Sequence, residues 1–307
     1  MNLNKLYEEL IKICPQDIVL RNEPMSHHTL TKIGGKADLF VLPETYEQVA
    51  VIVRLKNEYE IPFMLLGNGS NMIVRDGGVR GLVMHMKNLT DITVTGEKVK
   101  AQGGADIKEA SQIALNHRLS GLEFACGIPG SIGGAMVMNA GAYGGEVKDV
   151  IDHVIAVSED GELLTLKKEE LGLDYRTSII GKKNMIVLEA VFHLQSAEQI
   201  EIKEKMDDLT FQRESKQPLE YPSVGSVFKR PPGYFAGKLI QDSGLQGKGV
   251  GGAEVSTKHA GFIVNKNDAT ATDYIATIDM VRKTVKDNFG VELELEAKIV
   301  GEDLRND

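Results

Sequence analysis

The chain has 307 residues, of which 42% are hydrophobic and 26% are charged, as in an ordinary soluble globular protein. The net charge of −9 and the absence of a Lys/Arg-rich run exclude a general nucleic-acid-binding protein. Cys14 and Cys126 are the only cysteines and lie far apart, which excludes a disulfide framework and a zinc-ligand motif and indicates a reducing compartment. The N-terminus has a helical pattern of mixed charge rather than a signal peptide, so we expect a cytoplasmic protein without a membrane partner.

Hydrophobic periodicity predicts helices and strands mixed along the chain, which is typical of the α+β class. Helices are expected at 2–13, 44–59, 106–118, 196–216 and 272–289, with a short one after 237. Strands are expected at 31–42 (around a turn at Gly34-Gly35), 63–66, 72–74, 81–86, 92–101, 150–157, 162–166, 185–194, 261–265 and 291–300. The charged helix at 196–216 predicts a domain boundary near residue 200.

One stretch, FACGIPGSIGGAMVMNAGAYGG at 124–145, runs for 22 residues without a charge. Its seven glycines, together with Pro129 and Asn139, argue against a membrane span. Glycine allows a backbone to approach a ligand closely, and a helix N-terminus expected after Ser131 would favour an anion such as a pyrophosphate. On composition alone, a buried glycine-rich turn between core elements explains the stretch equally well.

A second stretch, PFMLLGNGSN at 62–71, places a tight polar turn directly after an apolar run of strand length. This is not a Rossmann fingerprint. Met72 stands where the third small residue is required, and Met72 to Val74 has the pattern of a strand rather than a helix.

A strand–GNGSN–strand unit followed by GIPGSIGGA and NAGAYG resembles the flavin fold of the vanillyl-alcohol-oxidase/PCMH superfamily, and more narrowly the UDP-N-acetylenolpyruvoylglucosamine reductase (MurB) family. The resemblance implies a two-part FAD-binding fold, formed by 1–84 with 298–307 and by 85–200, plus a C-terminal α+β substrate-binding domain at 201–297. It also implies that two glycine-rich loops hold the FAD pyrophosphate. The flavin-binding residues implied are Gly67, Asn68, Gly69, Ser70, Asn71, Gly127, Pro129, Gly130, Ser131, Gly133, Gly134, Asn139, Gly141 and Ala142.

Three further segments resemble the family's catalytic motifs. DYRTS at 174–178 is similar to its YRxS segment and gives Arg176 the arginine role. VGSVFKRP at 224–231 is similar to GSxFKxP and places Ser226 as the proton donor, and LEAKIVG at 295–301 places Glu296 as the catalytic glutamate. Tyr175 and Lys229 are implied substrate contacts.

Without the resemblance, none of these residues stands out. Glu296 falls on the polar face of an alternating strand, which is typical of a solvated surface. Arg176 has the pattern of a surface arginine at a strand–turn junction, and Ser226 that of a turn serine.

The resemblance implies that NADPH gives a hydride to FAD, and that the flavin passes it to UDP-N-acetylglucosamine enolpyruvate to form UDP-N-acetylmuramate for peptidoglycan synthesis. Arg176 would stabilise the negative charge that develops on the substrate. Ser226 would protonate the carbon, with Lys229 as a candidate to stabilise the alkoxide. Glu296 would hydrogen-bond to the substrate carboxylate or relay a proton.

Neither glycine-rich loop contains a histidine, so we expect FAD to be bound without a covalent link. The histidines show no shared spacing, so we expect no metal site, and a monomer is expected. Only Ile179 to Asn184 separate the YRTS segment from the next strand, which matches the shorter class that lacks a tyrosine-bearing loop. Two alternatives are another flavin oxidoreductase of the superfamily acting on a small alcohol, and a non-catalytic nucleotide-binding protein.

Overall fold

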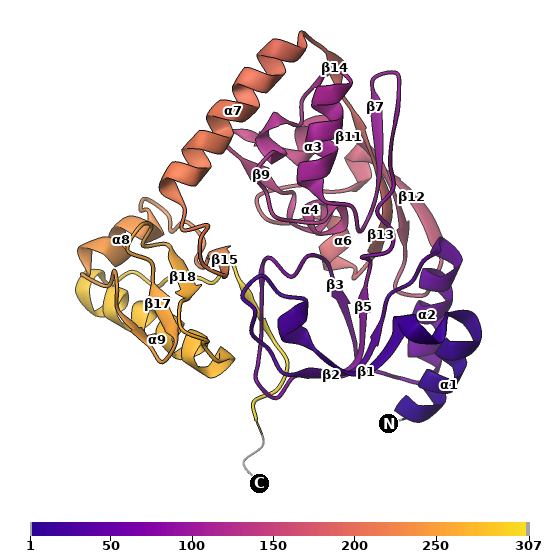
Figure 1. The fold of residues 1–307 in the computed structure, drawn as a ribbon, viewed down its shortest axis with the longest axis horizontal. Helices are drawn as coiled ribbons and strands as arrows, with labels where there is room; N and C mark the ends of the chain where they lie inside the picture. The colour runs from indigo at the N-terminus through magenta and orange to yellow at the C-terminus, as the bar shows by residue number, and fades with distance from the viewer. Residues whose placement is uncertain (1, 305–307) are drawn as a thin grey trace. The chain divides into compact units, whose positions relative to one another are not determined.

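A computed structural model describes residues 2–304 (Figure 1). The chain folds into two compact units. The first unit comprises the residues up to Arg21, Leu39–Asn68 and Gly81–Arg213. The second comprises Asn22–Asp38, Gly69–Arg80 and the residues from Glu214 on. The chain therefore passes between the units several times, and the division at 84, 200 and 297 stays a prediction.

A five-stranded antiparallel sheet in the order β12-β11-β13-β7-β6 forms the larger part of the first unit. Helices α3 and α4 pack against this sheet through one apolar core (Figure 1). The elements that belong to this part are β6 (Ile92–Thr95), β7 (Lys98–Gln102), α3 (Ile107–Asn116), β8 (Leu119–Ser120), α4 (Ile132–Met138), β9 (Gly141–Ala142), β10 (Gly145–Glu146), α5 (Val147–Val150), β11 (Ile151–Val157), β12 (Leu163–Lys167), α6 (Ile179–Lys182), β13 (Ile186–His193), β14 (Gln195–Ser196) and α7 (Gln199–Lys216).

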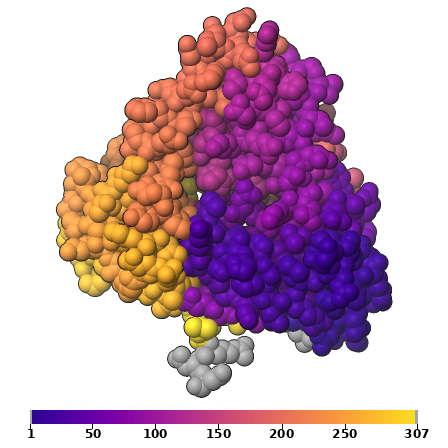
Figure 2. All heavy atoms as spheres, in the orientation of Figure 1, coloured from indigo at the N-terminus to yellow at the C-terminus, as the bar shows by residue number. Residues whose placement is uncertain are grey.

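A smaller sheet has the order β1-β2-β5-β3, and its β3 and β5 run parallel. The chain passes from one unit to the other within β1, β2 and β5. Helices α1 and α2 share a second apolar core with this sheet, and their outer faces lie in the continuous indigo surface of Figure 2. The elements are α1 (Leu3–Ile13), β1 (Val19–Pro24), β2 (Lys36–Val41), α2 (Tyr46–Glu58), β3 (Phe63–Leu66) and β5 (Val79–His85).

The second unit contains a four-stranded antiparallel sheet, in the order β15-β18-β17-β16, and a separate parallel pair of β4 and β19. Its core includes Ile33 and Ile73 from the two short N-terminal segments and the fully buried Tyr274 of α9. The elements are β4 (Met72–Val74), β15 (Ser223–Ser226), α8 (Ala236–Asp242), β16 (Gly249–Val250), β17 (Ala253–Val255), β18 (Phe262–Asn265), α9 (Ala271–Phe289) and β19 (Lys298–Val300).

Asp76 fastens one of the short segments to α9. Its carboxylate accepts hydrogen bonds from the backbone N–H groups of Ala271, at 2.8 Å, and Thr272, at 2.9 Å. These are among the N–H groups that a helix leaves without an internal partner, and a carboxylate is favoured there by the helix dipole.

The predicted long helices and the strands at 63–66 and 72–74 are confirmed. The strand expected before Gly34 is wrong, whereas β1 was not predicted, because its VLRNEP sequence lacks an alternating apolar pattern. The segment at 92–101 is a hairpin of two strands rather than one strand. No helix within residues 2–304 is both long and apolar enough to cross a membrane.

The strand expected at 291–300 is regular only at β19. Before β19, the segment pairs irregularly with residues 227–229: the N–H of Lys229 donates to the carbonyl of Glu294 at 2.9 Å, and the N–H of Glu296 donates to Val227 at 2.9 Å. At Lys298 the segment changes partner and joins β4. Periodicity cannot reveal this change, because a buried residue is followed by an exposed one both before it, at Leu293 and Glu294, and across it, at Ala297 and Lys298.

Glu123 ties the start of the glycine-rich stretch to α7. Its carboxylate, only 3% exposed, accepts hydrogen bonds from the hydroxyl of Ser120 at 2.6 Å and the N–H of Gly121 at 2.9 Å, and Lys205 of α7 lies 3.5 Å away. Burial by itself would raise the pKa of Glu123. The hydrogen bonds and the lysine outweigh burial and hold this pKa below its ordinary value of 4.5.

Glu123→Gln is expected to lower the free energy of unfolding by about 1–3 kcal/mol at pH 7, because the amide loses charge-assisted hydrogen bonds. A pKa that is depressed in the folded state adds stability above the unfolded pKa and loses it as pH falls through the folded pKa. The difference between wild type and Glu123→Gln should therefore shrink below pH 4.5. Urea unfolding at stepwise lower pH measures it, with exposed Glu159→Gln as the control. A difference that stays constant across this range would contradict the assignment.

Candidate functional site

Helix α4 begins within the glycine-rich stretch, at the position predicted. Ser131 caps it by accepting a hydrogen bond from the N–H of Gly134 at 3.2 Å. The preceding N–H groups of Ile132 and Gly133 donate to the carbonyls of Ala105 and Gly103, both at 2.8 Å. These first-turn donors are therefore used within the protein, and an anion must be held mainly by other N–H groups.

The first glycine-rich loop supplies such groups. In the part of the chain that the structure describes, no N–H from Gly67 to Asn71 donates a hydrogen bond to a protein acceptor. A run of unpaired backbone donors in a turn is a typical anion-binding arrangement. The loop therefore fits the phosphates of a dinucleotide.

The two predicted loops meet within the first unit. A methyl group at Gly67 would lie 2.5 Å from the hydroxyl of Ser131, so only glycine allows this approach. In the second unit, Gly69 has a φ of +60°, and a Cβ there would lie 2.2 Å from the carbonyl of His28. Both glycines are required by close packing and not only by turn formation.

The rest of the second loop packs mainly against protein. Pro129 is exposed, and the carbonyl of Gly130 accepts the N–H of Ile107 at 2.9 Å. Gly141 and Ala142 form β9, which pairs with β10 in a short hairpin. The structure gives these residues a place in the loop, and their contact with a flavin stays a prediction.

Sequence analysis missed Arg213, which lies against the second loop. A Cβ at Gly127 would lie 2.6 Å from the Cδ atom of Arg213. Burial lowers the pKa of Arg213, while Tyr143 and Cys126 act to raise it. The sequence does contain a signal: Ile202, Met206 and Leu209 form the buried stripe of α7, and Arg213 continues their helical spacing. A charged residue therefore occupies a position where an apolar one is expected.

Asn139 is fully engaged by protein groups. It ends α4 with a φ of 43° and is 1% exposed. Its Nδ2 donates to the carboxylate of Glu146 at 2.7 Å and to the carbonyl of Asp174 at 3.3 Å, and its Oδ1 accepts the N–H of Lys148 at 3.0 Å. These bonds show a structural role, and its predicted contact with the flavin stays a prediction.

The turn that carries Arg176 is fastened to α4 at two points. Asn139 binds the carbonyl of Asp174, and the hydroxyl of Ser178 donates to the carbonyl of Val137 at 2.9 Å. Arg176 has a left-handed backbone with a φ of 54°, and its guanidinium lies 5.6 Å from the ring centre of Tyr175. Tyr175 itself is 58% exposed. The turn therefore holds Arg176 on a rigid support.

Ser226 and Glu296 lie on paired segments of the second unit, while Arg176 belongs to the first. Ser226 is exposed at the end of β15, and the carbonyl of the next residue, Val227, accepts the N–H of Glu296 at 2.9 Å. The ammonium group of Lys229 forms an ion pair with Glu294. Two of the three predicted catalytic residues are thus brought onto neighbouring backbones.

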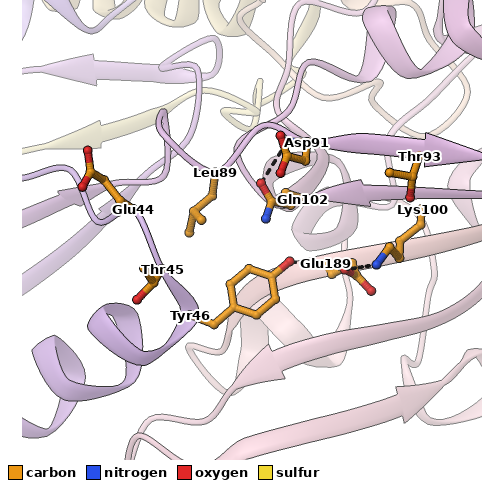
Figure 3. A pocket seen from close by; sticks show the side chains of 9 residues that line it. All are labelled: Glu44, Thr45, Tyr46, Leu89, Asp91, Thr93, Lys100, Gln102 and Glu189. Atoms are coloured by element: carbon orange, nitrogen blue, oxygen red, sulfur yellow. Dashed lines mark hydrogen bonds and ion pairs between the residues drawn. The ribbon is translucent and has the colours of Figure 1, made fainter.

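None of the predicted residues lines a pocket of about 370 Å³ in the first unit (Figure 3). Its polar groups pair with one another: the hydroxyl of Tyr46 and the ammonium of Lys100 each lie 3.3 Å from the carboxylate of Glu189. Burial raises the pKa of Tyr46. The pocket lies between α2 and the five-stranded sheet. Because its polar groups already pair with one another, it is a poor candidate for a ligand site. Residues 2–304 contain no group of three or more His, Cys, Asp or Glu side chains suited to hold a metal ion.

Comparison with known proteins identifies relatives of the whole chain. A family model described as "FAD binding domain" matches residues 37–167. A second model, described as "UDP-N-acetylenolpyruvoylglucosamine reductase, C-terminal domain", matches residues 217–300. A UDP-N-acetylenolpyruvoylglucosamine reductase of Geobacillus thermodenitrificans is 70% identical over 97% of this chain and 98% of its own. One of Oceanobacillus iheyensis is 60% identical over 97% of both chains.

Comparison with solved structures leads to the same family. The crystal structure of MurB from Thermus caldophilus has a TM-score of 0.78 and 33% identity, and the match covers 92% of this chain and 97% of that one. An alkyldihydroxyacetonephosphate synthase, at 18% identity and a TM-score of 0.50 over 64% of this chain and 41% of its own, is similar in fold alone. With the α+β architecture and the two loops described above, these findings confirm the PCMH-type fold expected from the sequence. The chain belongs to the UDP-N-acetylenolpyruvoylglucosamine reductase (MurB) family.

Proposed function

We propose that the chain is an FAD-dependent, NADPH-using reductase that converts UDP-N-acetylglucosamine enolpyruvate into UDP-N-acetylmuramate for peptidoglycan synthesis. The observation that carries the proposal is the 70% identity, over nearly the whole chain, to a relative that bears this reductase name. A cytoplasmic location and a monomeric state are part of the proposal, as is the assignment of 201–297 to the substrate.

The residues present fit FAD. The unpaired N–H groups of 67–71 would hold the pyrophosphate, and the close packing of Gly67 on Ser131 would bring the second loop beside it. The chemistry that FAD supplies when bound is transfer of a hydride from NADPH to the enolpyruvyl double bond. Side chains of this protein would stabilise the developing charge and donate the proton.

Arg176 would stabilise the negative charge that develops next to the substrate carboxylate. A cation lowers the energy of a transition state most when it is held in place beforehand. The ties from α4 to the Asp174–Thr177 turn provide this fixed position. Tyr175, on the same turn, would contact the substrate.

Ser226 would donate its hydroxyl proton to the substrate carbon. A serine hydroxyl is a weak acid, so its developing alkoxide needs stabilisation. Lys229 lies three residues away and would supply a positive charge for this purpose; its ammonium group forms an exposed ion pair with Glu294. Glu296, on the paired segment, would hydrogen-bond to the substrate carboxylate or relay the proton.

The purified protein is expected to be yellow. Addition of NADPH without substrate should bleach the visible absorbance of the flavin, and UDP-N-acetylglucosamine enolpyruvate should restore it. An absorbance spectrum after each addition measures both effects. A colourless protein, or a bleached one that the substrate does not reoxidise, would contradict the proposed function.

FAD is expected to be bound without a covalent link. The loops contain no histidine, and the Nε2 of His28, whose carbonyl lies nearest to Gly69, is hydrogen-bonded to Glu23 at 2.8 Å. Acid precipitation should therefore leave a colourless pellet and all flavin in the supernatant. Flavin that remains on the pellet would be evidence against this, and His28→Ala would then test whether that residue is the attachment point.

Ser226→Ala is expected to slow flavin reoxidation by substrate by about two to four orders of magnitude, the usual contribution of a positioned acid. Flavin reduction by NADPH should stay near its original rate, because Ser226 acts only after hydride reaches the substrate. Ser226→Cys should recover part of the loss, since a thiol is a stronger acid of similar size.

Stopped-flow absorbance, recorded separately with NADPH and with substrate, measures both half-reactions. Ser223→Ala, which removes a hydroxyl from the same strand, is the matched control. A Ser226→Ala protein that is reoxidised at normal speed, or that loses both half-reactions equally, would show that Ser226 shapes the site rather than protonating the product.

A further inference from the structure

The side chain of Asn71, the last residue of the GNGSN loop, lies against the backbone of Glu296. Its Nδ2 donates a hydrogen bond to the carbonyl oxygen of Glu296 at 3.1 Å. The backbone carbonyl of the same asparagine accepts the N–H of Lys298 at 3.0 Å. Asn71 therefore holds the chain on both sides of Ala297, and all these residues belong to the second unit.

The other side of Glu296 is held by the segment that carries Ser226. The carbonyl of Val227 accepts the N–H of Glu296 at 2.9 Å and that of Ala297 at 3.3 Å. Both peptide groups of Glu296 are thus hydrogen-bonded, one to the segment of the proposed acid and the other to the flavin loop.

Glu296 has no regular strand to define its position. It lies between the isolated pairing of Leu295 with Phe228 and the start of β19 at Lys298. The regular ladder with β4 begins only at the pairing of Lys298 with Met72. The amide of Asn71 therefore replaces a ladder hydrogen bond at a residue whose side chain is proposed to act on the substrate.

The chemistry of this contact requires an amide. A carbonyl oxygen accepts only from a donor, so the NH₂ group of asparagine satisfies it and the carboxylate of aspartate cannot. The backbone carbonyl of Asn71 would remain in place in either case. Asn71→Asp thus tests the side-chain bond at nearly constant size.

We infer that Asn71 is a positioning residue for the reductase reaction, which fixes the backbone of Glu296 and so directs its carboxylate. This inference rests on the proposed role of Glu296. It is compatible with a flavin contact by the N–H group of Asn71, because the side chain and the N–H are separate donors. It extends the part played by the GNGSN loop from holding the cofactor to ordering a residue of the second half-reaction.

A double-mutant cycle tests the inference in the flavin-loaded enzyme. Asn71→Ala and Asn71→Asp are each made in the wild type and in Glu296→Ala, and stopped-flow absorbance records both half-reactions. Each Asn71 variant alone is expected to slow reoxidation by substrate about 10- to 100-fold, because small displacements of a reacting group cost this much. In the Glu296→Ala background the same changes should slow reoxidation no further.

Asn265→Ala is the matched control. Its Nδ2 also donates to a backbone carbonyl of the second unit, that of Thr31, at 3.0 Å. The Oδ1 of Asn265 also accepts the N–H of Ala269 at 2.8 Å, so Asn265→Ala should lower the thermal unfolding temperature of the flavin-free protein at least as much as Asn71→Ala, yet leave both half-reactions within about twofold of wild type. Fluorescence titration of the flavin-free proteins should give FAD affinities for Asn71→Asp within about tenfold of wild type.

The outcomes separate the inference from the proposed function. If Glu296→Ala reoxidises at the wild-type rate, the proposed role of Glu296 and this inference are both wrong. If Glu296→Ala is slow but the Asn71 variants reoxidise normally, or multiply the defect of Glu296→Ala, only the inference is wrong. A loss that appears as weak FAD binding with a normal reoxidation rate would also overturn it, since Asn71 would then serve the cofactor alone.

Discussion

Hydrogen bonding of the backbone at residues 294–300 is the constraint on which the second unit depends. The segment pairs first with residues 227–229 and then with β4, so it connects the sheet of that unit to a short strand from the N-terminal part of the chain. This double pairing fixes the backbones of Ser226 and Glu296, the two residues of this unit that are proposed to act on the substrate. A change in its register by one residue would turn each side chain to the opposite face.

In the first unit, the glycine-rich stretch must be stabilised in one conformation. Helix α4 has seven residues, two of them glycine, and a helix this short is not stable on its own. Buried polar residues at its two caps supply part of the missing stability. Ser131 closes one end of the helix, and Asn139 closes the other while it binds the neighbouring turn. Because hydrogen bonds are directional, these ties fix the position of Arg176 more closely than apolar packing would.

Much of the fold was predictable because its signals are local. The apolar run at 63–66, the cap at Ser131 and the periodicity of α9 each depend on a few consecutive residues, and each prediction is confirmed. The family motifs allowed the site residues to be named, since their spacing is preserved in this chain. Sequence alone could not show which residues meet across long separations. Asn71 and Glu296 are 225 positions apart, and the use of the α4 N–H groups by Gly103 and Ala105 depends on how loops pack.

Arg213 and the 291–300 segment both show that a sequence pattern does not identify the contacts of a residue. The helical spacing of α7 predicts that Arg213 continues the buried stripe. Only the structure shows that this position lies against Gly127 of the second glycine-rich loop. The alternation at 291–300 correctly predicts that Leu293 and Ala297 are buried, but it does not tell which strand pairs with the segment. Side-chain pattern reports the environment of a segment, whereas its hydrogen-bond partners are set by tertiary structure.

The discontinuous make-up of the second unit has a consequence for synthesis on the ribosome. Residues 22–38 and 69–80 are made early, but the rest of the second unit begins only at Glu214, and β4 pairs with β19, at residues 298–300. At translation rates of about 5–20 residues per second, Asn71 waits roughly 10 to 45 seconds for Glu296. During that interval β4 is an unpaired edge and Ile73 lacks its core, which is the state in which nascent chains associate wrongly. β19 therefore ends this period of exposure for β4 and also completes the parallel pair, and a chain released before Lys298 would leave β4 exposed.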